Sequence, residues 1–347
     1  MSPFEHVPVV ELGRLPNGAI AGASADQLAE ICHRVGFFVA VDHGIDDGVV
    51  DDVFTVMERF FALPRAEREL IDKRRSRHFR GWEDVGAEQT NNRPDLRQQI
   101  DLWSEWPAHD RDVHPEYRRL LGPNQWMPDD VVPGFRPALT RWFTQLGALA
   151  DDLLAVFAEG LGLPTDHFAG MFGEGAMSLT KLIDYPPTPA GAAGVNAHHD
   201  AGFLTLLATD GTPGLQVQNE AGEWIDVPHV AGSFVVNLGE MLQGMTANYF
   251  VATPHRVITE RPRRSAGYFH GPALDTPLEP LPLAPRFHAA VAASARHAGA
   301  GFMASRDETD AGVGEMASNY RATTYGEQLW NYFSRSYPDL MAEHYGT

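Results

Sequence analysis

The 347-residue chain contains a single cysteine, Cys32, so it cannot form an intrachain disulfide and gives no sign of an oxidising compartment. No segment approaches the roughly 20 consecutive apolar residues that are needed to cross a bilayer. The N-terminus lacks the basic start and the long apolar core of a signal peptide. We therefore expect a cytoplasmic protein that has no membrane partner.

Positive charge is scarce relative to negative charge. The chain has 27 Lys and Arg residues against 46 Asp and Glu residues, which gives a formal net charge of -19. Because such a surface repels phosphate backbones, we expect no nucleic-acid partner. Hydrophobic residues make up 44% of the chain, enough for one large β-rich domain or two modest ones. The composition does not indicate an oligomeric state.

The first half of the chain alternates apolar runs with segments of helical spacing. Residues 65–133 interrupt this pattern, because they are charged and irregular. They bring Arg74, Arg75, Arg77 and Arg80 close together, either as an anion site or as a solvated face or loop. The patterns predict strands at Val7–Leu12 and Gly36–Val41, and helices at Asp26–Val35 (capped by Ser24), Val49–Phe61 and Gly134–Leu163.

After Gly162 the pattern changes to short β-prone runs separated by Gly, Pro, Asn and Asp. Regular short strands with turn signals between them predict a sandwich or jelly roll. The Pro-rich segment Pro277–Pro285 is expected to be a loop, and Tyr325–Tyr337 a helix that packs on the core. The predicted strands are Ser178–Tyr185, Gly202–Ala208, Leu215–Gln218, Ser233–Leu238, His255–Ile258 and Ser265–Phe269.

Three side chains are candidate metal ligands. On a strand, residues two apart point to the same face, so His198 and Asp200 should converge while His199 points away. His255, on a later predicted strand, can supply a third ligand. Two imidazoles and one carboxylate on one face of an octahedron leave the other positions open, which suits non-haem Fe(II) chemistry with oxygen. A lone histidine is more often a packed or surface residue, so the prediction depends on the combination.

A possible carboxylate receptor follows the last candidate ligand. Arg263 and Ser265 are again two residues apart, so both can face the interior of a barrel. A guanidinium and a hydroxyl together suit a carboxylate, and a buried arginine is costly without an anion. Spacing alone supports a surface basic patch over Arg256–Arg264 equally well.

With these residues in place, the chain resembles the isopenicillin N synthase-like family of Fe(II)-dependent oxygenases, most of which use 2-oxoglutarate. The resemblance runs over almost the full length, and the order and spacing of its motifs make it specific. The motifs are Val35–Phe38, Asp42–Ile45, Phe60–Pro64, Arg80–Trp82, Asn124–Trp126, Asp184–Pro187, His198–Leu207, Gly214–Val217 and Pro254–Val257.

The resemblance implies a mainly β protein with flanking helices, namely a distorted double-stranded β-helix or jelly roll with iron inside it. It further implies an N-terminal oxygenase region at 1–125 and, at 126–347, the catalytic core with a C-terminal helix. By this resemblance His198, Asp200 and His255 are the catalytic iron ligands. Arg263 and Ser265 match the family's carboxylate-binding pair, and Tyr185 lies beside the position where a tyrosine often assists.

The implied activity is oxidation of a small organic substrate by hydrogen abstraction, with Fe(II), 2-oxoglutarate and O2, in specialised metabolism. Relatives such as isopenicillin N synthase and aminocyclopropane carboxylate oxidase keep the Arg-x-Ser pair without using 2-oxoglutarate, so the pair does not decide the co-substrate. Ethylene formation is a further alternative within the family. A non-catalytic β-barrel binding protein and a zinc hydrolase are the alternatives outside it.

Overall fold

The strands form an eight-stranded and a four-stranded sheet in the computed structural model, which describes residues 3–90, 93–294, 297 and 323–346. The large sheet has the order β1-β2-β12-β9-β14-β7-β6-β3 and the small sheet the order β11-β10-β13-β8. A ribbon of β4 and β5 packs beside β8. The strands are β1 Val9–Glu11, β2 Phe37–Val41, β3 Gly81–Glu83, β4 Gln89–Thr90, β5 Arg93–Pro94, β6 Gln98–Trp103, β7 Leu179–Tyr185, β8 Ala193–His198, β9 Leu204–Thr209, β10 Leu215–Gln218, β11 Trp224–Asp226, β12 Phe234–Leu238, β13 His255–Ile258 and β14 Arg263–His270.

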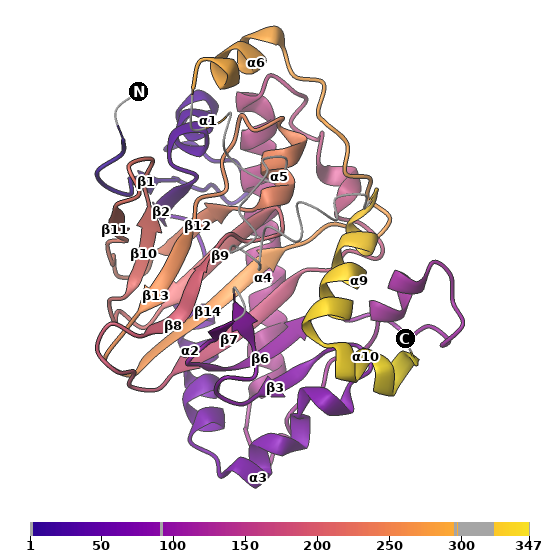
Figure 1. Ribbon diagram of the computed structural model, residues 1–347. Coiled ribbons are helices and arrows are strands. Elements are labelled where there is room, and N and C mark those ends of the chain that lie inside the picture. Colours follow the sequence, from indigo (N-terminus) through magenta and orange to yellow (C-terminus); the bar gives the residue numbers. More distant parts are fainter. Residues whose placement is uncertain (1–2, 91–92, 295–296, 298–322, 347) are drawn as a thin grey trace.

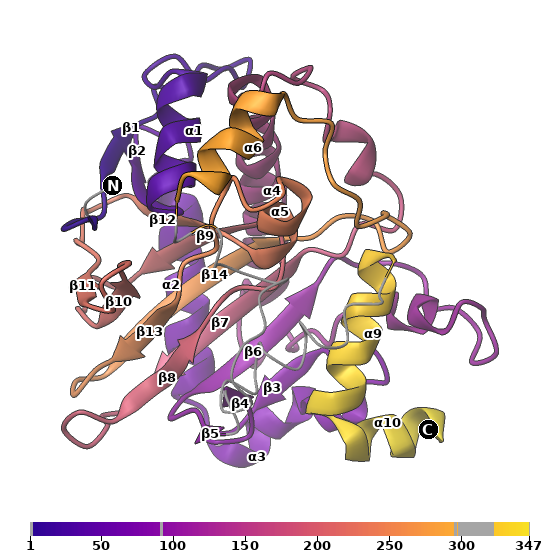
Figure 2. The same cartoon turned by 45° about the horizontal axis from the view of Figure 1, so that its top comes forward.

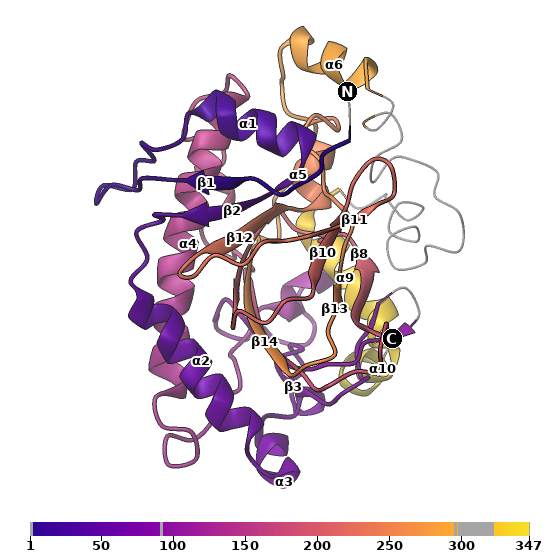
Figure 3. The same cartoon turned by 90° about the vertical axis from the view of Figure 1, so that its left-hand side faces the viewer.

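Helices cover the outer face of the large sheet, and the small sheet faces its inner side (Figures 1 and 3). Figure 2 shows the C-terminal helices α9 and α10 beside the end of the large sheet that carries β6 and β3. None of the helices in the described ranges is long and apolar enough to cross a membrane. The helices are α1 Ala25–Arg34, α2 Asp47–Phe61, α3 Arg65–Arg68, α4 Phe135–Gly160, α5 Glu240–Met245, α6 Pro285–Ala292, α9 Tyr325–Ser336 and α10 Pro338–Tyr345.

Strand alternation divides the apolar side chains between two cores. Phe38, Leu206 and Val236 point outward into the core that α2 and α4 complete. Their strand neighbours Phe37 and Val235 point inward, into a second core between the two sheets. Because successive residues of a strand face opposite sides, one sheet serves both cores. The predicted mainly β architecture with flanking helices is confirmed.

The predicted helices form where the apolar spacing places them. Ser24 caps α1, its hydroxyl accepting a hydrogen bond from the Gln27 N–H at 3.1 Å. The 26-residue helix α4 buries a long stripe against the large sheet, including Leu146 and Leu149. Trp142 of the same stripe donates from its indole N–H to the Thr180 hydroxyl of β7 at 3.2 Å.

The expectation of an irregular segment at residues 65–133 is wrong. The short helix α3 and strands β3, β4, β5 and β6 lie within it, and β6 is buried along its whole length. The arginine cluster also disperses: Arg80 is fully buried, whereas Arg74 is exposed and forms an ion pair with Asp72. The sequence pattern did not indicate β6, because the strand carries polar residues that face a polar interior.

The packing of α4 on the large sheet makes a stability prediction. Leu149 is fully buried between them, so Leu149→Ala should lower the free energy of unfolding by about 2–5 kcal/mol through lost burial and a residual cavity. Urea unfolding measures this loss. Thr144→Ala on the exposed face of the same helix is the control, and an equal loss in both variants would contradict the packing argument.

A buried histidine predicts how stability depends on pH. Burial, reinforced by the charge of Arg80, lowers the pKa of His78 to about 4, against an ordinary value near 6.5. Between these values the unfolded chain binds the proton more tightly, so stability is complete above about pH 6.5 and falls by up to about 3 kcal/mol as the pH drops to 4. Urea unfolding at several pH values tests this. His78→Phe should remove that part of the slope, and an unchanged slope would refute the assignment.

Candidate metal centre

The pairing of β8 with β13 brings two histidines face to face. His198 at the end of β8 is directly opposite His255 at the start of β13, with ring centroids 4.2 Å apart. The Asp200 Oδ1 atom is 3.7 Å from His198 Nε2 and 3.6 Å from His255 Nε2. Among the described residues these form the one group of three or more His, Cys, Asp or Glu side chains placed to hold a metal ion.

Hydrogen bonds turn the three side chains towards a common point. The Nδ1 atoms of His198 and His255 lie 2.8 and 3.2 Å from the carbonyls of Asn196 and Thr253. Because a carbonyl only accepts, each Nδ1 carries the proton and each Nε2 presents a lone pair to the centre. Hydrogen bonds from the large sheet orient Asp200 towards the same point.

The carboxylate of Asp200 has one oxygen engaged by the protein. Its Oδ2 accepts from the Thr205 hydroxyl at 2.6 Å and from the Asn237 amide at 2.7 Å. Its Oδ1 therefore faces the two imidazoles. Both donors belong to the large sheet, on β9 and β12, so this sheet positions the carboxylate and the small sheet positions the rings.

The protonation states suit metal binding. Burial, reinforced by the neighbouring His255, lowers the pKa of His198 to about 3. Burial alone would raise the pKa of Asp200, but His255, His198 and the two hydrogen bonds hold it below its ordinary value. Neutral imidazoles beside an ionised carboxylate are the forms that bind a divalent cation.

Asp200 converges with His198 for a different reason from the predicted one. Strand β8 ends at His198, and Asp200 lies in the connection to β9. That connection is fixed against α5, because the Asp200 carbonyl accepts from the Glu240 N–H at 2.8 Å. A Cβ at Gly239 would meet the Gly202 carbonyl oxygen at 2.0 Å, so only glycine permits this contact. His199 lies outside the triad, with its Nδ1 4.0 Å from Glu240 Oε1.

Arg263 and Ser265 lie on the inner face of the large sheet. Both are 1% exposed, so the alternative of a surface basic patch is wrong for them. Arg263 pairs across the strands with Tyr185, and its guanidinium carbon lies 5.1 Å from the centre of that ring. Arg264, one position on, points the other way and forms an ion pair with Asp184.

The Arg263 guanidinium has unused hydrogen-bonding capacity. Its Nε donates to the Thr212 carbonyl at 3.3 Å, whereas Nη1 is buried and has no partner among the described residues. A buried cation in this state is costly unless an anion approaches it. With the Ser265 hydroxyl on the same face, the site fits a carboxylate, and the triad's nitrogen and oxygen donors fit Fe(II).

A polar wall continues this inner face beyond the predicted residues. Strand register places Lys181 of β7 on the same face as Tyr185 and opposite Asp101 of β6. The Lys181 ammonium lies 2.9 Å from Glu88, which also pairs with Arg97 at 2.7 Å. Arg97 is itself buried and paired with both Glu88 and Asp95. The alternation of β6 was the signal that could have revealed this wall.

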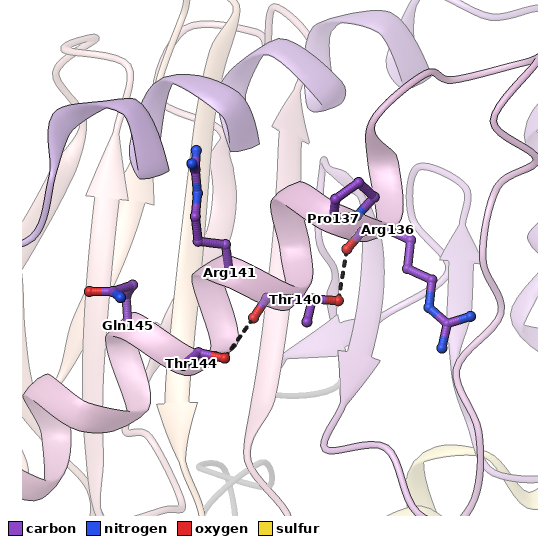
Figure 4. Close-up of a pocket in the computed structure, with 6 residues that line it drawn as sticks. All are labelled: Arg136, Pro137, Thr140, Arg141, Thr144 and Gln145. Carbon is purple, nitrogen blue, oxygen red and sulfur yellow. Dashed lines mark hydrogen bonds between the residues drawn. The ribbon is translucent and has the colours of Figure 1, made fainter.

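A hollow lies on the outer face of α4, away from the triad (Figure 4). The hydroxyls of Thr140 and Thr144 there donate to carbonyls of their own helix, those of Arg136 and Thr140. Arg141 pairs with Asp52 of α2. These groups are occupied by structural contacts, so the hollow offers no chemistry.

Comparison with known proteins agrees with this geometry. Residues 7–129 match the family model described as the non-haem dioxygenase in morphine synthesis N-terminal region, and residues 174–272 match the 2OG-Fe(II) oxygenase superfamily. A 2-oxoglutarate-dependent dioxygenase, frbJ, of Dothideomycetidae sp. is 32% identical over 80% of this chain and 77% of its own length. A homoarginine-6-hydroxylase of Arabidopsis thaliana is 30% identical over 80% of this chain and 88% of its own.

Solved structures show the same fold. A crystal structure from Caulobacter crescentus ascribed to the 2OG-Fe(II) oxygenase family superposes with a TM-score of 0.71 at 22% identity, over 96% of this chain and 99% of its own. The dioxygenase for auxin oxidation 1 of Arabidopsis thaliana, in its 2-oxoglutarate complex, gives a TM-score of 0.59 at 21% identity, over 79% and 96%. The predicted double-stranded β-helix is confirmed, and the chain belongs to the Fe(II)- and 2-oxoglutarate-dependent oxygenases.

Proposed function

We propose that His198, Asp200 and His255 hold the Fe(II) of this oxygenase, and that Arg263 and Ser265 hold the distal carboxylate of 2-oxoglutarate. The observation that carries the proposal is the convergence of three ligand atoms within 4.8 Å on the inner surface that also bears a buried, incompletely paired guanidinium. When bound, the iron would activate O2 with electrons supplied by 2-oxoglutarate, so that O2 could oxidise a small organic substrate with which it reacts too slowly alone.

The three ligands would occupy one face of the metal's coordination sphere. Two imidazole nitrogens and one carboxylate oxygen would hold the metal and leave it able to bind exogenous ligands. The hydrogen bonds to Nδ1 of each histidine and to Oδ2 of Asp200 keep the ligand atoms aimed without help from the metal. The protein therefore contributes a preorganised site.

Arg263 and Ser265 would recognise a carboxylate by charge and geometry together. The guanidinium is enclosed by Tyr185 on one side, and Gly194 of β8 packs against that ring so closely that a Cβ would lie 2.7 Å from it. In this low-dielectric setting the attraction between guanidinium and carboxylate is stronger than in water. The zinc hydrolase alternative gives such a receptor no role.

The substrate is proposed to be a small polar molecule. Support comes from the wall that borders the site, where Lys181, Glu88 and Asp101 are buried with their charges mutually paired. The homoarginine-6-hydroxylases of rice, soybean and Arabidopsis among its relatives act, by their names, on a charged amino acid. An apolar substrate would gain little from such a wall.

Removing the carboxylate ligand tests the metal site. Asp200→Ala should weaken Fe(II) binding by more than about 100-fold, since losing a ligand costs more than losing an outer hydrogen bond. Anaerobic titration with Fe(II) and then 2-oxoglutarate, monitored by visible absorption, reports both steps. Asp166→Ala, on an exposed loop, should titrate like the parent. Undiminished Fe(II) binding by Asp200→Ala would eliminate this assignment.

Arg263 gives a prediction in which stability and binding move in opposite directions. Arg263→Leu should leave the metal-free protein equally stable, or more stable by about 1–4 kcal/mol, because it removes an incompletely paired buried charge. The same change should cost about 2–5 kcal/mol of 2-oxoglutarate affinity. Urea unfolding and calorimetric titration measure the two effects.

Arg264→Leu is the matched control for that experiment. It alters the neighbouring residue on the opposite face of β14, where Arg264 pairs with Asp184 rather than facing the site. Its 2-oxoglutarate affinity should equal that of the parent protein. Equal affinities in Arg263→Leu and Arg264→Leu would exclude Arg263 as the carboxylate receptor.

A further inference from the structure

The strand that carries His198 is at the edge of its sheet. Strand β8 is the last in the order β11-β10-β13-β8, so only one of its sides pairs with a strand of that sheet. Its pairing with β13 is also irregular here, because the register shifts between His255 and Val257. Strand β8 is therefore hydrogen-bonded on one side, and this pairing is interrupted next to His198. Such pairing fixes the His198 side chain less firmly than regular pairing on both sides would.

A buried carboxylate from the N-terminal half holds the open side of β8. Asp95 is fully buried, and its Oδ1 accepts from the Asn196 backbone N–H at 3.2 Å and from the Asn196 amide at 3.1 Å. The Asn196 carbonyl in turn accepts from His198 Nδ1 at 2.8 Å. One residue therefore receives the Asp95 contacts and orients the His198 ring.

The second carboxylate oxygen of Asp95 is fixed by its own hydrogen-bond partners. Its Oδ2 accepts from the Thr90 hydroxyl at 2.8 Å and from the Arg97 guanidinium at 3.1 Å. Arg97 is fixed in turn by Glu88, which also binds Lys181 and the Tyr332 hydroxyl of α9. Because these charges are buried and mutually paired, displacing one leaves another uncompensated, which is costly. The network thus gives Asp95 a fixed position.

We propose that Asp95 is a positioning residue for His198, acting through Asn196 and anchored by Arg97. The inference rests on the proposed function, because it assigns His198 to the metal. Thr205 and Asn237 orient Asp200 from the large sheet, and Asp95 does the equivalent for His198 from outside the small sheet. Outer contacts of this kind alter metal affinity although they do not touch the metal.

The test compares two ways of removing Asp95. Asp95→Ala deletes the contact, and Asp95→Leu combined with Arg97→Met replaces the pair by apolar side chains of similar size, which buried ion pairs often tolerate. Metal-free proteins are titrated anaerobically with Fe(II), and then with 2-oxoglutarate while the visible absorption band is recorded. Both variants should bind Fe(II) about tenfold or more weakly and show a shifted band.

Asp184→Ala is the matched control. Asp184 is another carboxylate of this sheet region paired with an arginine, Arg264, but among the described residues it has no hydrogen bond or ion pair with β8. It should lower the free energy of unfolding in urea and leave Fe(II) affinity and band unchanged. If either Asp95 variant folds and matches the parent in affinity and band, Asp95 is only structural and the proposal is overturned. If the parent itself binds no Fe(II), the proposed function fails first, and this assignment with it.

Discussion

The antiparallel pairing of β8 with β13 is the constraint on which the site depends. It places His198 opposite His255, so that two residues distant in sequence present their Nε2 atoms to one point. A shift of one position would turn one ring to the opposite face, because side chains alternate along a strand. The large sheet then has to orient only the carboxylate of Asp200, through hydrogen bonds from Thr205 and Asn237.

The inner face of the large sheet buries polar groups, which costs free energy. Apolar packing on its outer face offsets this cost. Outward-pointing residues such as Leu182, Leu206 and Val236 build a continuous apolar core with α4. The inward neighbours are therefore free to include Arg263 and Lys181 without loss of the sheet's main source of stability. Lys181 is neutralised by protein carboxylates, whereas Arg263 keeps a buried N–H unpaired. This difference separates a structural cation from one suited to a ligand.

Sequence alone predicted the parts of the site that follow from local rules. The spacing of two residues predicted that Arg263 and Ser265 share one face of a strand. The family motifs predicted that His198, Asp200 and His255 come together. It did not predict β6, because the polar–apolar alternation is limited to Gln99–Leu102 and lies in a segment whose charges suggested a loop. The partners that make those charges tolerable, such as Lys181 for Glu88, lie far away in sequence. Only the fold brings them into contact.

The same long-range contacts connect the N-terminal residues with the proposed metal site. Strands β2 and β6 flank β12 and β7 in the large sheet, so the catalytic strands would have unpaired edges without them. Asp95 comes from the same region and reaches the backbone next to His198. Under the two proposals, one metal ligand, Asp200, is oriented by the C-terminal half, and another, His198, is oriented in part by the N-terminal half. Both halves of the chain therefore contribute to the geometry of the proposed metal site.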